Sequence, residues 1–217
     1  MRSILVANPK GGSGKTTLAT NLAAALAHAG DVVCLWDLDR QHSALEWLKL
    51  RSRQLPRIVR LDERESAPRE ADWLVLDSPA GLHGKRLHKI IKEAERVLVP
   101  LQPSLFDIAA TRDFLAELAK EKAVRKHKTF VGIVGNRLDS RTRAATQLMA
   151  YLHEHDMPLV SSLRDTQLYA NAAFMGMSIF DLPSWQSEVE AQLWQPIIDW
   201  VRRDDRAPES RARGVVE

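Results

Sequence analysis

Apolar and polar positions follow two alternating patterns along this chain of 217 residues. Short, continuously apolar runs predict strands at 4–7, 32–36, 57–61, 73–76, 97–99, 130–134 and 158–160. Longer stretches with helical periodicity predict helices over 15–29, 41–53, 83–94, 107–122, 142–155, 165–175 and 186–203. Because apolar strands separated by helices indicate a parallel sheet covered on both faces, the sequence predicts an α/β fold with one doubly wound, mostly parallel sheet.

The chain is expected to form one domain over residues 1–203, since no repeat or long linker divides it. Residues 204–217 are polar and contain Pro208 and Gly214, which predicts a flexible tail. The N-terminal apolar run is too short for a signal peptide, and no run reaches the roughly 18 apolar residues of a membrane span. We therefore expect a cytoplasmic protein. The single cysteine, Cys34, excludes an internal disulfide and any four-cysteine metal site within one chain.

A glycine-rich segment lies between the first predicted strand and the first predicted helix. It reads Pro9-Lys10-Gly11-Gly12-Ser13-Gly14-Lys15-Thr16-Thr17, a variant phosphate loop with Pro9 where the usual motif begins with glycine. Glycines let backbone amides turn toward phosphate oxygens, and the helix N-terminus adds positive potential. We expect Lys15 to bridge the β- and γ-phosphates and the Thr16 hydroxyl to coordinate Mg²⁺. The alternative is a glycine-rich turn that opens an ordinary helix.

Carboxylates follow two further strands of the predicted sheet. Asp37 and Asp39 close the second strand, and Asp77 closes the strand at 73–76. In a doubly wound sheet the carboxyl ends of the strands line the ligand crevice. Carboxylates there can hold Mg²⁺ through water or position an attacking water, although a single aspartate after a strand is often only a turn or cap residue. Together with the loop, the three aspartates favour a nucleotide site.

These segments resemble the signature of the ParA/MinD family of ATPases. Residues 10–17 resemble its deviant Walker A box, residues 37–44 its second box (usually D-x-D-P-Q-G-S) and residues 77–81 its Walker B box. The resemblance continues through 99–104, Asp107 and 135–137, then Arg164, Tyr169, Ala172 and Gly176, and covers the chain to about residue 203. It implies a P-loop ATPase fold of the short ParA type, and we expect no DNA-reading domain before it.

The resemblance also implies roles for single residues. Lys10 matches the signature lysine that reaches across an ATP-dependent homodimer to the partner's phosphates, comparable to an arginine finger. Asp39 matches the aspartate that orients the attacking water. Asp37 and Asp77 match carboxylates near the Mg²⁺, and Asn136 falls where the family contacts adenine.

Two departures from the second box lie beside Asp39. Arg40 replaces the usual proline and His42 the usual glycine. Neither change removes a catalytic group. We expect the loop beside Asp39 to turn less sharply as a result.

The net charge of +3 is small, but the basic residues are clustered. One cluster lies in residues 49–60 and another in residues 120–143. Such clusters suit sequence-independent contacts with DNA phosphates, although a solvated helix face has the same composition. The candidate DNA-binding residues are Lys120, Lys122, Arg125, Lys126, Lys128, Arg141, Arg143, Arg164, Arg202 and Arg203.

The resemblance implies a switch rather than a metabolic reaction: an ATP-bound dimer holds nucleoid DNA, and an adaptor protein stimulates slow Mg²⁺-dependent hydrolysis and release. The cargo would be a plasmid, a chromosome or an organelle such as a carboxysome. One alternative is a MinD-like ATPase on a membrane, but the apolar stripe at 189–201 contains Pro196 and is expected to pack against the sheet. Another is a metabolic enzyme of the dethiobiotin synthetase type. A nitrogenase iron protein would need a pair of cluster cysteines.

Overall fold

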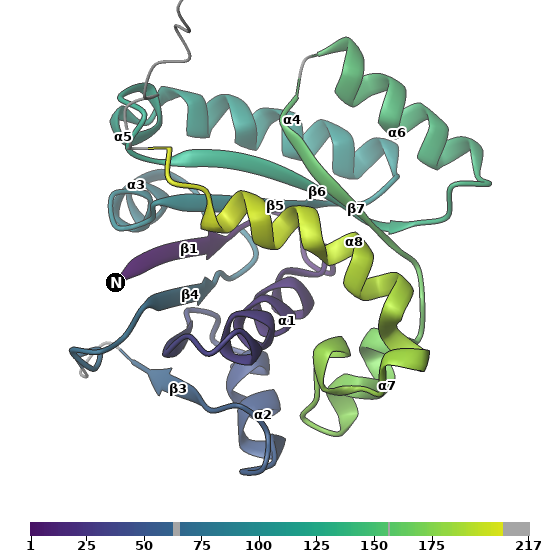
Figure 1. Ribbon diagram of the computed structural model, residues 1–217. Coiled ribbons are helices and arrows are strands. Elements are labelled where there is room, and N and C mark those ends of the chain that lie inside the picture. The colour runs from purple at the N-terminus through teal and green to yellow at the C-terminus, as the bar shows by residue number, and fades with distance from the viewer. Residues whose placement is uncertain (63–65, 156, 206–217) are drawn as a thin grey trace, which may run out of the picture.

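The computed structural model describes residues 1–62, 66–155 and 157–205 and shows a central sheet between two layers of helices (Figure 1). The sheet has seven parallel strands in the order β3-β2-β4-β1-β5-β6-β7. Their bounds are β1 Arg2–Val6, β2 Val33–Asp37, β3 Ile58–Leu61, β4 Trp73–Asp77, β5 Arg96–Leu101, β6 Phe130–Leu138 and β7 Leu159–Arg164. The predicted doubly wound parallel sheet is therefore confirmed.

Helices lie between most pairs of successive strands, and α7, η1 and α8 follow the last strand. The bounds of the helices are α1 Lys15–His28, α2 Ser43–Leu50, α3 Gly84–Ile91, α4 Leu105–Lys120, α5 Lys122–Arg125, α6 Arg143–Glu154, α7 Leu168–Phe174, the 3-10 helix η1 Ile179–Asp181 and α8 Ser184–Arg202. Each longer helix lies within a few residues of its predicted range. The pattern did not predict α5 and η1, since one turn of helix carries no periodicity that could be recognised.

Alternate residues of the strands face opposite layers of helices. On one face, Ile4, Val6 and Leu35 pack with α1 and α8; on the other, Leu5 and Leu76 pack with α3 and α4. A smaller cluster joins β6 to α6. Because both faces are covered, the central strands are apolar throughout, which is the pattern that the sequence shows.

Helix α8 belongs to this core. Trp194, Ile197 and Val201 are fully buried, Pro196 lies inside the helix without ending it, and Val189 at the other end of the stripe is exposed. This confirms the expectation that the stripe packs against the sheet. In the part of the chain that the structure describes, no helix has the length and apolar character needed to cross a membrane.

The end of α8 is fixed at the amino edge of the sheet, where the strands begin. The Arg96 guanidinium lies 4.7 Å from the Trp200 ring centroid and 5.0 Å from that of Phe130, and it forms an ion pair of 2.6 Å with Asp205. Asp205 belongs to the tail predicted for residues 204–217, of which the structure describes Asp204 and Asp205. The remainder of the predicted tail, 206–217, lies outside the described residues.

Candidate nucleotide-binding site

Three strands end at the same level and bring the predicted site residues together. In the parallel register Val6 and Asp37 both lie beside Asp77, so the loops after β1, β2 and β4 leave the sheet side by side. Backbone contacts join them, since Gly81 donates a hydrogen bond of 2.9 Å to the Pro9 carbonyl. This is the carboxyl edge of the sheet, where ligands bind in doubly wound folds.

The glycine-rich loop ends on a residue that must be glycine. Gly14 caps α1 with φ +94°, and a Cβ there would lie 2.1 Å from Asn136 Nδ2. The Asn136 amide donates to the Ser13 carbonyl at 2.8 Å. Asn136 therefore supports the phosphate loop from the end of β6, and the adenine contact that the resemblance implies for it stays a prediction.

Lys15 lies inside the loop. Its ammonium donates to the Lys10 carbonyl at 2.7 Å and is 3.4 Å from Ser13 Oγ. Burial lowers the pKa of Lys15, and the carboxylates of Asp77 and Asp39 oppose this change. A buried cation at the start of a helix is the arrangement that attracts phosphate oxygens. In contrast, the half-buried Lys10 ammonium has no hydrogen bond or ion pair with any described residue.

Two residues that the sequence analysis gave no role hold this loop from behind. Asn8 is fully buried, donates to the Pro100 carbonyl (2.8 Å) and to Thr111 Oγ1 (3.1 Å), and accepts from the Lys10 amide (2.8 Å). Gln102 donates to the Gly12 carbonyl at 2.7 Å. The loop is therefore preorganised by the neighbouring strand β5.

Thr16 and Asp77 form the pair expected near a metal. The Thr16 hydroxyl donates to Asp77 Oδ2 at 2.7 Å, and Asp77 is only 1% exposed. Burial raises the pKa of Asp77 to about 7, while the hydrogen bond from Thr16 lowers it. The other oxygen, Oδ1, is buried and has no hydrogen-bond partner among the described residues. A hydroxyl and a carboxylate with a free lone pair fit Mg²⁺, which prefers oxygen ligands.

No group of three or more His, Cys, Asp or Glu side chains that could hold a metal occurs among the described residues. Mg²⁺ commonly keeps several waters and binds through one or two carboxylates together with substrate phosphates. This is how Mg²⁺ is usually bound at nucleotide sites.

Asp37 shapes the loop that carries Asp39. Its Oδ2 accepts the backbone amides of Ala44 (2.9 Å) and Leu45 (3.2 Å), and its Oδ1 accepts that of Asp39 (2.9 Å). One carboxylate oxygen is thus engaged by the start of α2 and the other by the loop before it. The role near the metal stays a prediction, since it requires the remaining lone pairs of these oxygens.

The sequence predicted that the loop beside Asp39 turns less sharply, because His42 stands where the family usually has glycine. His42 adopts the left-handed conformation itself, with φ 52° and ψ 34°. Hydrogen bonds from the His42 amide to the Asp39 carbonyl and from the Glu46 amide to the His42 carbonyl hold the turn. A histidine thus adopts a backbone conformation that glycine adopts without strain.

The predicted DNA-binding residues do not form one surface. Arg141, Arg143 and Arg164 lie near the carboxyl ends of β6 and β7, whereas Arg202 and Arg203 end α8 at the amino edge. Arg141, Arg164 and Arg202 pair with Asp139, Glu190 and Asp31 respectively. The cluster in residues 120–128 is exposed and makes no ion pair with described residues, apart from Glu121 with His88. The cluster in 49–60 is broken up, because Arg51 is buried against Asp181.

Comparison with known proteins assigns the chain. The family described as the CobQ/CobB/MinD/ParA nucleotide binding domain matches residues 4–179. The chain belongs to this family. It is 32% identical to the chromosome-partitioning ATPase Soj of Thermus thermophilus, over 71% of this chain and 77% of Soj. It is 28% identical to the maintenance of carboxysome distribution protein A of Halothiobacillus neapolitanus, over 83% of this chain and 87% of that protein.

Solved structures show the same fold. The ATP complex of McdA from Cyanothece superposes with a TM-score of 0.68 at 16% identity, covering 91% of this chain and 96% of McdA. MinD from Aquifex aeolicus superposes with a TM-score of 0.68 at 20% identity, covering 94% and 96%. With the family match, this makes the chain an ATPase of the ParA/MinD type, and the candidate nucleotide site described above lies at the carboxyl edge of its sheet.

Proposed function

We propose that this ParA/MinD-type ATPase is a switch that dimerises on binding ATP with Mg²⁺, holds DNA without sequence preference and releases it after stimulated hydrolysis. The observation that carries this proposal is the Lys10 ammonium, which lies beside a complete phosphate loop and has no partner among the described residues. A cation in this position can bind the phosphates of the nucleotide held by a second protomer. Lys15, buried in the same loop, binds the phosphates of the nucleotide held by its own protomer.

An exposed apolar segment next to the loop supports the dimer. Leu105 and Phe106 begin α4 and are each 76% exposed. They follow Gln102, which is hydrogen-bonded to Gly12 of the phosphate loop, so their position depends on that of the loop. Large apolar side chains exposed beside a charged site are typical of a surface that a partner covers. We infer that the second protomer covers them when ATP is bound.

The site residues then have the following roles. Lys15 and the amides of residues 11–17 bind the phosphates, Thr16 and Asp77 hold the metal, and Asn136, which is hydrogen-bonded to the Ser13 carbonyl, contacts the base. The Mg²⁺ ion would supply positive charge where phosphate oxygens accumulate negative charge. Asp39 orients the attacking water, with Asp37 fixing its loop.

The dimer step can be tested with Lys10→Ala. Sedimentation velocity with ATP and Mg²⁺ should show a monomer, whereas the wild type dimerises. Binding of a fluorescent ATP analogue to the monomer should change little, because the Lys10 ammonium makes no hydrogen bond or ion pair with a described residue of its own loop. Dimerisation of the variant at wild-type ATP concentrations would refute the role in trans.

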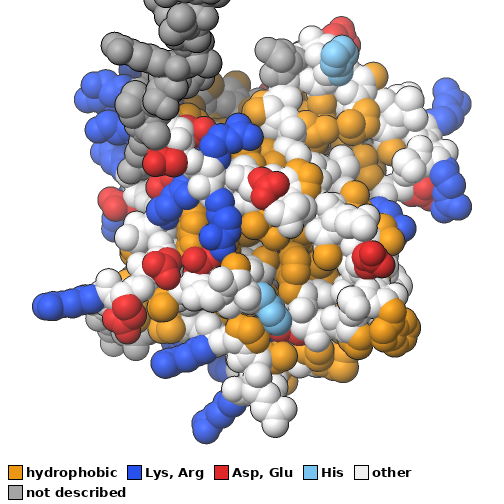
Figure 2. All heavy atoms as spheres, in the orientation of Figure 1, with side chains coloured by type: hydrophobic (Ala, Val, Ile, Leu, Met, Phe, Trp, Pro, Cys, Tyr) orange, Lys and Arg blue, Asp and Glu red, His pale blue; other side chains and the backbone are white. Residues whose placement is uncertain are grey.

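The DNA surface is proposed at the amino edge of the sheet. There the end of α3 lies against the α4–α5 junction, since His88 pairs with Glu121 at 2.6 Å and Thr129 Oγ1 donates to the Ala94 carbonyl at 2.7 Å. Exposed cations from both segments meet here, with Glu93 as the exposed carboxylate beside them. Figure 2 shows Lys and Arg side chains gathered at the α5 side of the molecule. We define the amino-edge basic surface as Lys89, Lys92, Lys120, Lys122, Arg125, Lys126 and Lys128.

Charge removal at two places tests this surface. The triple variant Lys122→Gln, Arg125→Gln, Lys126→Gln should weaken DNA binding and reduce the slope of log K against log salt by about three. The matched control Arg53→Gln, Arg57→Gln, Arg60→Gln removes the same charge near β3 and should leave the slope near that of the wild type. Equal effects of the two variants would show that net charge alone matters and that the surface is wrongly assigned.

The cargo is proposed from the relatives. Two of the similar proteins are named for the maintenance of carboxysome distribution and one for chromosome partitioning. We infer that the chain positions either a DNA complex or a protein organelle, through an adaptor that stimulates hydrolysis, and that it associates with the nucleoid. A fluorescent fusion should follow the nucleoid in the wild type and become diffuse in the Lys10→Ala variant. A pattern that is unchanged by Lys10→Ala would contradict this.

A further inference from the structure

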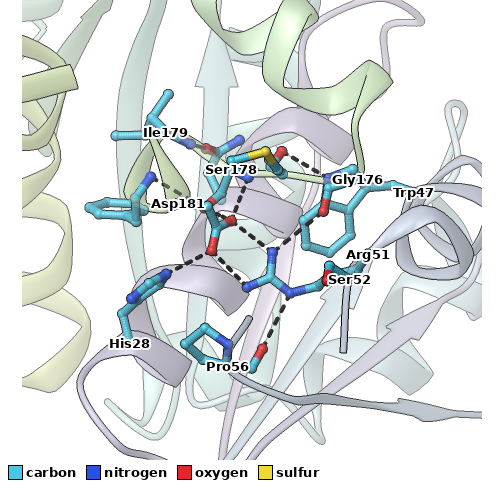
Figure 3. A network of polar contacts seen from close by, with 12 residues as sticks. His28, Trp47, Arg51, Ser52, Pro56, Gly176, Ser178, Ile179 and Asp181 are labelled. Carbon is cyan, nitrogen blue, oxygen red and sulfur yellow. Dashed lines mark hydrogen bonds and ion pairs between the residues drawn. The ribbon is translucent and has the colours of Figure 1, made fainter. Parts of the chain in front are cut away.

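A buried polar network joins the end of α2 to the segment before α8 (Figure 3). Arg51, which caps α2, donates from Nη1 and Nη2 to the two oxygens of Asp181 at 2.7 and 3.0 Å. The side chains are 4% and 0% exposed. The Ser178 amide and hydroxyl donate to Asp181 Oδ2, and His28 Nε2 lies 2.7 Å from Oδ1. With both oxygens bound several times, the pair is held in one orientation.

The backbone also closes tightly at this place. Gly176 has φ +65°, and a Cβ on it would lie 2.4 Å from the Leu50 carbonyl carbon and 2.5 Å from the Arg51 nitrogen. Trp47 of α2 donates from its indole to the Met177 carbonyl at 3.0 Å. We call residues 176–181 the strap. It lies directly against the C-terminal end of α2.

The strap is fastened to the phosphate-loop helix as well. The backbone amide of Ile179 donates to Asn21 Oδ1 at 2.9 Å, and the side-chain amide of Asn21 (Nδ2) donates to the Thr17 carbonyl at 2.9 Å. Thr17 directly follows Thr16, whose hydroxyl donates to Asp77. Through Asn21 the strap therefore has a fixed position relative to the first turn of α1.

The opposite end of α2 carries the loop with Asp39. Asp37 accepts the amides of Ala44 and Leu45 at the start of the helix and that of Asp39 before it. An α-helix of 8 residues is a stiff element about 12 Å long. A displacement of its C-terminal end at Arg51 therefore moves its N-terminal end and the loop beside it.

We propose that Arg51 and Asp181 are positioning residues for ATP hydrolysis. Their ion pair holds α2, and with it Asp39, at a fixed distance from the phosphate loop on α1. A buried ion pair adds little net stability compared with apolar side chains of the same size. Here the ion pair fixes the orientation of α2 relative to the strap, and through the strap relative to α1. Both α2 and α1 lie beside part of the site. The inference rests on the proposed role of Asp39.

The test uses the full chain with Arg51→Lys, which keeps the charge but loses the two-pronged pairing, and Asp181→Asn, which keeps the acceptor oxygen but loses the charge. At a temperature where circular dichroism shows each variant folded, kcat for ATP hydrolysis should fall at least about tenfold, since small misplacements of reacting groups are costly. The Kd of a fluorescent ATP analogue should change less than about threefold, because the phosphate loop is untouched. Hydrogen exchange at the amides of 43–50 should become faster in both variants.

Arg2→Lys is the matched control. Arg2, on β1, also donates from two guanidinium nitrogens to a carboxylate, here to a single oxygen of Glu95, and its replacement should leave kcat unchanged. The proposal is overturned if folded Arg51→Lys and Asp181→Asn hydrolyse ATP like the wild type, if nucleotide affinity falls as much as kcat, or if Arg2→Lys has the same effect.

A parallel Asp39→Ala variant separates the two ideas. Hydrolysis by Asp39→Ala at the wild-type rate would refute the proposed catalytic role and with it the route by which the ion pair acts. An inactive Asp39→Ala variant beside a fully active Arg51→Lys variant would refute the positioning role alone.

Discussion

Asp77 is predicted to lower the stability of the nucleotide-free protein at neutral pH. Burial raises the pKa of this carboxyl from 3.8 to about 7. A group whose pKa is higher in the folded state stabilises the fold fully below its unfolded pKa, and this contribution is lost as the pH rises through the folded pKa. The difference of about 3 pKa units corresponds to roughly 4 kcal/mol of unfolding free energy lost between about pH 4 and pH 7.

The isosteric variant Asp77→Asn removes the titration and keeps an oxygen that can accept from Thr16. Without metal and nucleotide it should match the wild type near pH 4 and exceed it by roughly 4 kcal/mol above pH 7, as an order of magnitude. Urea unfolding between pH 4 and 8 in the presence of EDTA measures this difference. Addition of Mg²⁺ and ATP should reduce it, since cations beside Asp77 favour its charged form. A stability difference that does not vary with pH would refute the reasoning.

Further predictions concern single positions. His42→Gly should stabilise the protein by up to about 1 kcal/mol in urea unfolding, because φ 52° strains a histidine; a lower urea midpoint would contradict this. Gly176→Ala should lower the free energy of unfolding by about 2 kcal/mol or more in thermal melts, since its Cβ meets the backbone of Leu50; an unchanged melt would show that the strap can move. Asn136→Ala should weaken binding of a fluorescent ATP analogue about tenfold through loss of its bond to Ser13, and wild-type affinity would show that this support is dispensable.

The sequence predicted the parts of the site that depend on local spacing. Lys15 and Thr16 follow a strand and open a helix, so their neighbourhood is determined by short-range rules. Asp37 and Asp77 end adjacent strands of a parallel sheet, and a parallel register places such residues side by side. These inferences required no knowledge of how distant segments pack.

Residues whose roles depend on contacts between distant segments were not predicted. Asn8 supports the phosphate loop through Pro100 and Thr111, yet an asparagine after a strand is indistinguishable in sequence from a turn residue. Arg51 looked like one member of a basic cluster, whereas its partner Asp181 lies 130 positions away. A run of like charges in the sequence does not indicate which of them the fold will bury.

The two edges of the sheet separate the proposed activities. The carboxyl edge carries the phosphate loop, Lys10 and the exposed Leu105 and Phe106, while the amino-edge basic surface lies at the other ends of the strands. A dimer that joins the carboxyl edges leaves the two basic surfaces at its outer ends, where they cannot merge into one. ATP would then increase DNA affinity by linking two weak surfaces in one particle, because the second contact is made at a high effective concentration. A monomer should accordingly keep the weak, salt-sensitive binding of a single surface, and hydrolysis would release DNA by separating the pair while each surface stays intact.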